Sequence, residues 1–175
     1  HEFVPFLTIS ETAREVGITV TSASKGWNIA GLKSALIVSQ NEAIDEVLKL
    51  MPLAVKFRSS ILGAFASAAA FKDGELWLDS VIDTLEENSL MVRNLLAAKL
   101  PSVKTHLPQS SYVAWLDLSA LNLGENPAQT LLERGKVAFN AGHLYGAQST
   151  QFVRLNYATS PTILTEAIDR IVKSL

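Results

Sequence analysis

The sequence has no cysteine, so disulfide bridges and cysteine-based metal sites are excluded. Histidine is scarce as well: the three residues, His1, His106 and His143, lie far apart along the chain. Such spacing is a poor zinc signature, and we expect no metal site. Neither sign of charge is concentrated, because the net charge is −2 and the basic residues form no stripe. A nucleic-acid partner is therefore not expected.

Long apolar runs are also lacking. The longest weakly polar stretch, 61–71, is too short to cross a bilayer, and no segment resembles a signal peptide. We therefore expect a soluble, cytoplasmic protein without a membrane partner. That stretch belongs to an alanine-rich helix predicted over 59–71, which we expect to be buried in the core or at a subunit interface. The hydrophobic content of 48% is sufficient for one good core or two small ones.

One lysine stands out because of the residues around it. Lys25 lies between two apolar runs of the strand type, 18–20 and 35–38, with Ser22 before it and a second cation, Lys33, after it. A buried amine beside another cation loses proton affinity, and a neutral lysine attacks aldehydes. The hydroxyls and Lys33 could hold a phosphate. The pattern predicts a Schiff-base lysine with a phosphate site; spacing alone leaves open an ordinary solvated loop lysine.

The string SASKGWNIAGLK, residues 22–33, resembles the lysine motif of fold type I pyridoxal-phosphate enzymes, in the class I/II aminotransferase family. Its Lys-x-aromatic-Asn followed by Ala-Gly-Leu is most similar to the cystathionine β-lyase, or C–S lyase, branch. The resemblance implies that Lys25 holds pyridoxal 5'-phosphate (PLP) as an imine and that Ser22 binds the cofactor phosphate. Lys33 stands where many relatives carry a phosphate-binding arginine, so it keeps the charge without the bidentate fork.

A second informative stretch is the strand predicted over 152–157. Alternation places Arg154 on one face and Val153, Leu155 and Tyr157 on the other. An arginine in an apolar strand is costly to bury without an anionic partner. Its guanidinium suits a bidentate carboxylate clamp, and a structural salt bridge is the alternative that spacing leaves open.

This stretch resembles the R-L-N-x-A element of the same enzymes, in which the arginine binds the substrate α-carboxylate. The resemblance therefore implies that Arg154 is a substrate-binding residue. Tyr145, in the glycine-flanked loop 140–146, stands where relatives often have an aromatic side chain near the substrate. The two motifs occur in the family's order and approximate separation, and the resemblance covers essentially the whole chain.

Lys25 comes near the start of the chain, whereas a parallel-sheet cofactor site needs several strands before it. Family members are roughly twice as long, so we interpret the chain as the C-terminal part of a larger enzyme. The expected fold class is α/β. Residues 1–72 would form the C-terminal part of the PLP-binding large domain, with antiparallel neighbouring strands at 18–22 and 34–38. Residues 73–175 would form an α+β small domain, entered by a long linking helix over about 75–100.

Capping residues and periodicity predict the remaining elements. Ser10 and Asn41 are expected to cap helices, and Trp77 is expected in the core. In the small domain we expect strands over 103–106, 112–118 and 136–139, a helix over 127–134, and a last helix opened by Ser160.

The resemblance implies a PLP-dependent enzyme that acts on a small amino-acid substrate and is a homodimer at full length. Lys25 would be displaced by the substrate amine and then remove the α-proton as general base. A sulfur leaving group on Cβ gives β-elimination from a cysteine S-conjugate, with a thiol, pyruvate and ammonia as products. Without a leaving group on Cβ, the same residues give transamination.

The motif leaves these two activities open. The lyase-like Trp27-Asn28 pair favours the lyase, and a class I/II aminotransferase is the alternative. A non-catalytic binding or regulatory module that keeps the fold is the alternative of another class. We expect the 175-residue chain to be inactive by itself.

Overall fold

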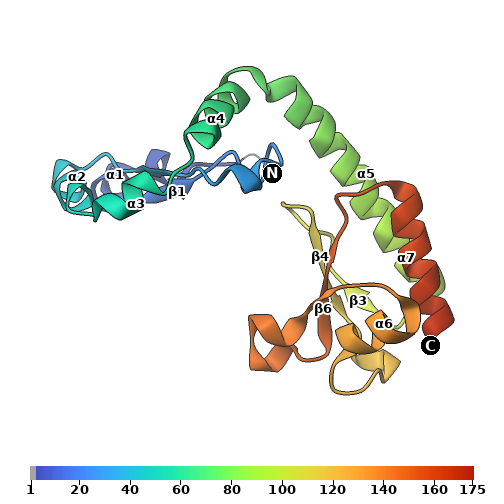
Figure 1. Ribbon diagram of the computed structural model, residues 1–175. Helices are drawn as coiled ribbons and strands as arrows, with labels where there is room; N and C mark the ends of the chain where they lie inside the picture. Colours follow the sequence, from blue (N-terminus) through green and yellow to red (C-terminus); the bar gives the residue numbers. More distant parts are fainter. Residues whose placement is uncertain (1–2) are drawn as a thin grey trace. The chain divides into compact units, whose positions relative to one another are not determined.

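The computed structural model describes residues 3–175, and the chain divides into two compact units, which are described separately. The first ends at Ser80 and the second begins at Val81. Helix α5 (Glu75–Lys99) begins in the first unit and continues in the second (Figure 1). Its bounds confirm the long helix predicted over about 75–100. Within the described residues, no helix is both long and apolar enough to cross a membrane.

The first unit contains a pair of short antiparallel strands, β1 (Thr19–Thr21) and β2 (Leu36–Val38), with Val20 opposite Ile37. The predicted strands and their antiparallel pairing are confirmed. The sequence between them forms a turn and the short 3₁₀ helix η2 (Ala30–Leu32). In residues 3–175 each of these strands has one edge without a strand partner.

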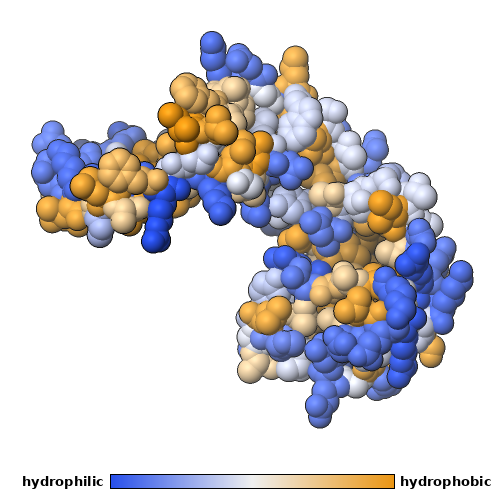
Figure 2. Space-filling model, viewed as in Figure 1, coloured by the Kyte–Doolittle hydropathy of each residue, from blue (hydrophilic) through white to orange (hydrophobic). Residues whose placement is uncertain are grey.

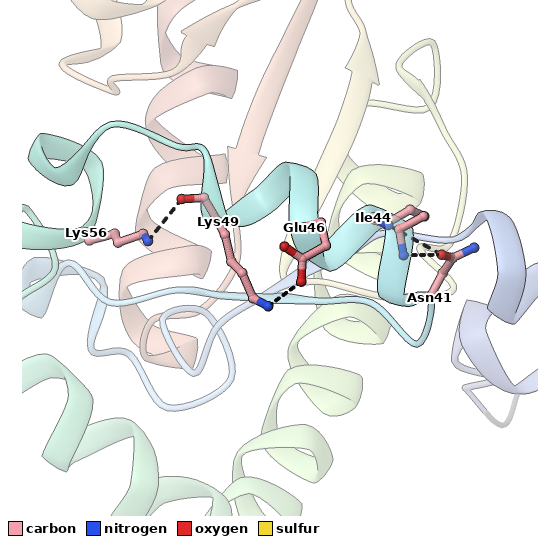
Figure 3. A network of polar contacts seen from close by, with 6 residues as sticks. Asn41, Ile44, Glu46, Lys49 and Lys56 are labelled. Atoms are coloured by element: carbon pink, nitrogen blue, oxygen red, sulfur yellow. Dashed lines mark hydrogen bonds and ion pairs between the residues drawn. The ribbon is translucent and has the colours of Figure 1, made fainter.

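Polar caps fix where the helices of this unit begin. Ser10 Oγ accepts a hydrogen bond from the N–H of Ala13 at 3.1 Å and opens α1 (Glu11–Val16). Asn41 opens α2 (Glu42–Lys49) in the same way, and both predicted caps are confirmed. Figure 3 shows the Asn41 cap together with two surface contacts of Lys49: its ion pair with Glu46 and the bond from Lys56 Nζ to its carbonyl. Both ends of the ion pair are exposed, so the pair stabilises the helix by at most about 1 kcal/mol.

The remaining helices of the first unit are η1 (Phe6–Thr8), α3 (Leu53–Phe57) and α4 (Ile61–Asp73). The helix predicted over 59–71 exists as α4. It is not buried in the core of the first unit, and its burial at a subunit interface stays a prediction. Ile61, Leu62 and Phe65 are 71%, 68% and 70% exposed. The surface over α4 is mostly apolar in Figure 2. Trp77, expected in the core, is about half exposed as well.

The second unit is built on an antiparallel sheet with the strand order β3-β4-β6-β5. Its strands are β3 (Lys104–Thr105), β4 (Val113–Asp117), β5 (Asn140–Ala141) and β6 (Phe152–Asn156). Helices α6 (Pro127–Gly135) and α7 (Pro161–Ser174) complete it, with the 3₁₀ segments η3 (Ser119–Leu121), η4 (Gly142–Tyr145) and η5 (Ala147–Ser149). Asn126 and Ser160 cap the two helices, each with proline in the first turn.

One face of this sheet lines the hydrophobic core of the second unit. Alternate residues of the two central strands point into it, including Leu116 of β4 and Val153 of β6, which are almost fully buried. The helices supply the opposite side of the core, with Leu96 from α5, Leu131 from α6 and Ile168 from α7. The predicted alternation of strand 152–157 is thereby confirmed, and the other face of the sheet is left for polar and aromatic side chains.

The strand predicted over 136–139 is wrong. Lys136 has a left-handed backbone, with φ 55°, and ends helix α6. The N–H of Val137 donates to the carbonyl of Leu131 at 3.3 Å, a bond typical of helix C-termini with a left-handed residue. These residues terminate the helix and cannot begin a strand at once, so pairing with β6 starts only at Asn140.

Candidate functional site

Lys25 lies in a tight turn over residues 23–27, directly after β1. The turn is fixed from within: the N–H of Trp27 donates to the carbonyl of Ala23 at 3.1 Å, and Ala23 is fully buried. The side chain of Lys25 is exposed and makes no hydrogen bond or ion pair with the described residues. The fold therefore presents a free amine on a rigid backbone.

The hydroxyl predicted to bind phosphate belongs to Ser22, which directly precedes this turn. Ser22 is half-buried, and its Oγ accepts a hydrogen bond from the N–H of Ser24 at 3.4 Å. That contact uses a lone pair of the oxygen and leaves the hydroxyl proton available to an anion. Ser22 thus lies between β1 and the turn that carries Lys25, and the roles predicted for both residues stay predictions.

Lys33 ends η2 in a left-handed conformation, with φ 49°. Its N–H donates to Ala30 at 3.2 Å, and its carbonyl accepts from the N–H of Ser60, which opens α4, at 3.2 Å. A left-handed lysine costs roughly 1–3 kcal/mol and persists only where its surroundings fix it. The side chain is exposed. The donor set of this region, two amines and a hydroxyl, fits the aldehyde and the phosphate of PLP chemically.

Trp27 anchors the lysine turn to the point where α4 ends and α5 begins. Its indole Nε1–H donates to the carbonyl of Gly74 at 3.0 Å, and its ring meets Phe71 edge to face, with centroids 5.0 Å apart. A Cβ on Gly74 would lie 2.3 Å from Nε1, so only glycine permits this approach. Two residues after Lys25, a large side chain thus fixes the backbone that carries the amine.

We expect Trp27→Phe to lower the free energy of unfolding by roughly 0.5–1.5 kcal/mol, because one neutral hydrogen bond is lost. Urea unfolding of the purified protein measures the change. Trp77→Phe is the matched control, since Trp77 is half-exposed and makes no hydrogen bond with the described residues. Equal losses in the two variants would contradict the anchoring role of Trp27.

Arg154 lies on the face of the second sheet opposite to the core. Its neighbours in register are Trp115 on β4 and Asn140 on β5, so the three side chains form a row across the sheet. Arg154 Nη2 donates to Asn140 Oδ1 at 2.9 Å. The aromatic ring of Tyr145 lies under the guanidinium, with Cζ 5.3 Å from the ring centroid. The structure therefore brings together Arg154 and Tyr145, both predicted site residues.

Aromatic contacts hold Tyr145 in place. Its ring meets Trp115 edge to face, with centroids 5.3 Å apart, and Trp115 stacks on Phe152 at 5.6 Å. Tyr145 ends η4, which packs closely on β6, since a Cβ on Gly142 would lie 2.6 Å from the carbonyl oxygen of Phe152. The cation–π contact with Arg154 is therefore fixed by several neighbours.

No carboxylate among residues 3–175 forms an ion pair with Arg154. The structural-salt-bridge alternative thus has no partner in the described part of the chain. The guanidinium is incompletely satisfied, because its Nε is buried without a hydrogen-bond partner. A cation held by an amide and an aromatic ring keeps its full charge, which is the chemistry of an anion-binding group.

The strand that carries Arg154 is secured at its end by a buried asparagine. Asn88 of α5 is 2% exposed, and its Nδ2 donates to the carbonyls of Tyr157 and Thr159 at 3.0 and 2.9 Å. Tyr157 is buried and its hydroxyl donates to Ser111 at 3.0 Å; burial raises the pKa of this phenol. These contacts fix the backbone that follows β6.

Sequence reasoning missed Asn140, Trp115 and the anchoring contact of Trp27. A single polar residue at the end of a short strand leaves no periodic signal, so Asn140 could be found only from the strand register. Lys25 and Arg154 belong to different units, and each is placed by the contacts of its own unit.

Comparison with known proteins shows which family has this fold and these motifs. The model of a family described as aminotransferase class I and II matches residues 2–171. The chain belongs to this family. The cystathionine β-lyase of Corynebacterium glutamicum is 38% identical over 169 residues, which cover 95% of this chain and 45% of that protein. The cystathionine β-lyase PatB of Bacillus subtilis is 34% identical over 182 residues, 100% of this chain and 46% of that protein.

Among solved structures, cystalysin from Treponema denticola, which contains a pyridoxal 5'-phosphate cofactor, superposes with a TM-score of 0.89. The two sequences are 26% identical, and the superposed region covers 99% of this chain and 45% of cystalysin. The resemblance to the class I/II family and the expected α/β fold of type I are confirmed. The chain spans about half the length of the relatives it matches.

Proposed function

We propose that this chain is the C-terminal part of a PLP-dependent C–S β-lyase that resembles cystathionine β-lyase. The observation that carries the proposal is the exposed, unpaired amine of Lys25 in a fixed turn. Its support comes from the family, whose members similar to this chain include cystathionine β-lyases. The substrate class is a small amino acid with a sulfur leaving group on Cβ.

The cofactor that this function needs is PLP, which withdraws electrons from the substrate Cα when bound. Lys25 Nζ would hold its aldehyde carbon covalently. Ser22 would donate its hydroxyl proton to the phosphate, and Lys33 would contribute charge without the bidentate geometry of an arginine. Both side chains are free for this task in the described residues: Ser22 keeps its proton and Lys33 is exposed.

Each remaining residue has a definite task towards the substrate. Once released, Lys25 Nζ would take the proton from Cα as general base. Arg154 would bind the α-carboxylate through its guanidinium, which no carboxylate of residues 3–175 neutralises. Tyr145 would help to hold that guanidinium in position through its ring, whose centroid lies 5.3 Å from Cζ.

The full-length parent should release pyruvate from cystathionine or an S-alkylcysteine, with one thiol for each pyruvate. A lactate-dehydrogenase-coupled assay follows pyruvate, and a thiol reagent follows the second product. The alternative is a class I/II aminotransferase, because the same lysine and arginine serve both reactions. Amino-group transfer to a 2-oxo acid without release of thiol would establish that alternative and contradict the lyase proposal.

The remaining assignments belong to the same proposal. Residues 1–72 would be the C-terminal part of the PLP-binding domain, and residues 73–175 the small domain. The full-length parent would be a cytoplasmic homodimer, and the chain by itself would be inactive. A non-catalytic module that keeps the fold is the alternative of another class, and absence of both lyase and transfer activity in the loaded parent would favour it.

A further inference from the structure

We infer that Asn140 is a positioning residue that orients Arg154 while leaving its positive charge available to the substrate carboxylate. This inference rests on the proposed function, in which Arg154 binds that carboxylate. It assigns a role to a residue that no sequence pattern had indicated.

Asn140 contacts Arg154 through both backbone register and side chain. The two residues are opposite each other on β5 and β6, and Arg154 Nη2 donates to Asn140 Oδ1 at 2.9 Å. A guanidinium carries donors only, so the amide must present its oxygen to it. This is the sole side-chain hydrogen bond of the guanidinium with residues 3–175.

Two neighbours fix the remaining freedom of the guanidinium. Its Cζ lies over the ring of Tyr145, 5.3 Å from the centroid, and Nε is buried without a hydrogen-bond partner. With Cζ over the ring of Tyr145 and Nη2 bonded to Asn140, rotation about the last torsions of the side chain is restricted. Arg154 is only partly buried, so the group stays within reach of a ligand.

The neutrality of Asn140 is the decisive property. An aspartate has the same shape and accepts the same hydrogen bond, but its charge would form an ion pair with Arg154. An internal carboxylate would then compete with the carboxylate of the substrate for one guanidinium. An amide orients the cation without neutralising it, and no carboxylate in the described residues pairs with Arg154.

The test is Asn140→Asp in the PLP-loaded full-length parent. We expect KM for an S-alkylcysteine to rise roughly ten- to hundredfold, the range of one charge-assisted contact, with kcat changed by less than about threefold. The melting temperature should stay unchanged or rise, because the bond to Arg154 is kept and strengthened. A purely structural role of Asn140 predicts unchanged KM, and that result would overturn the inference.

Two ligand probes separate the charge effect from general damage. L-Alanine carries the amine and the carboxylate without a leaving group, whereas n-propylamine lacks the carboxylate. Spectral titration should show weaker binding of L-alanine to the Asn140→Asp variant and unchanged binding of n-propylamine. Equal weakening of both ligands would contradict an action through Arg154.

Two further variants keep the inference and the proposed function distinguishable. Asn140→Ala should raise KM by a smaller factor than Asn140→Asp, because orientation is lost but no competing charge is added; a larger rise would overturn the inference. Arg154→Lys should raise KM whether or not Asn140 has the positioning role. If Arg154→Lys leaves KM unchanged, the proposed carboxylate site fails; if it raises KM and Asn140→Asp does not, only the inference about Asn140 fails.

Discussion

Lys25→Ala in the full-length parent is expected to lower kcat for β-elimination by at least about a thousandfold, because a positioned proton-transfer group alone contributes roughly 10²–10⁴-fold. The variant also loses the covalent attachment of the cofactor. Folding should be preserved, since the Lys25 side chain is exposed and contacts no described residue through a hydrogen bond or ion pair. The measurement is the rate of pyruvate release with saturating S-alkylcysteine.

Lys72→Ala is the matched control for this variant. Lys72 is an exposed lysine of the same unit, on α4, and is expected to leave kcat unchanged. Borohydride reduction of the loaded parent, followed by peptide mapping, provides an independent test. A pyridoxyl label should be found on Lys25, and a label on another lysine would refute the assignment even if Lys25→Ala were inactive.

The lysine turn could be predicted from sequence because its signals are local. A lysine after a strand, with Ser22 before it and glycines after it, constrains the backbone over few residues, and the structure has β1, the turn and β2 in that order. The anchoring of Trp27 on Gly74 could not be predicted. It joins residues 47 positions apart, and the sequence shows two tryptophans in this unit without indicating which one donates to a carbonyl.

The surroundings of Arg154 show the same limit. Period-two alternation predicted which face of β6 it occupies, because Val153 and Leu155 must enter the core. It gave no information about which residues lie opposite on neighbouring strands. That depends on register, which here places Trp115 and Asn140 beside Arg154.

The structure contradicts the strand predicted over 136–139 and the core position expected for Trp77. The strand predicted over 136–139 failed because Lys136 takes the left-handed conformation that closes α6, which is uncommon for a residue other than glycine or asparagine. Alanine and glycine on every side of α4 define no single apolar face, so composition did not distinguish the core of this unit from a subunit interface as the place of the helix. Composition shows that such a helix is apolar and does not show which chain covers it.

The 175-residue chain by itself is not expected to sustain turnover, and one reason is the exposed apolar surface of its first unit. Leu62 and Phe65 of α4 are mostly exposed, and burial of each such side chain stabilises a protein by about 1.5–3 kcal/mol. Together with the unpaired strand edges of β1 and β2, this surface favours association with another chain. We expect the first unit to be digested by protease before the second.

Turnover is expected to fail for a chemical reason as well. In this chain the proposed cofactor contacts, Ser22, Lys25 and Lys33, address the aldehyde and the phosphate only. A reactive PLP site also needs its ring sandwiched and its ring nitrogen paired with a carboxylate, in one preorganised arrangement. The purified chain, mixed with PLP and cystathionine, should therefore give no continuous pyruvate release above PLP alone. Sustained release that Lys25→Ala abolishes would show that this chain is sufficient for catalysis.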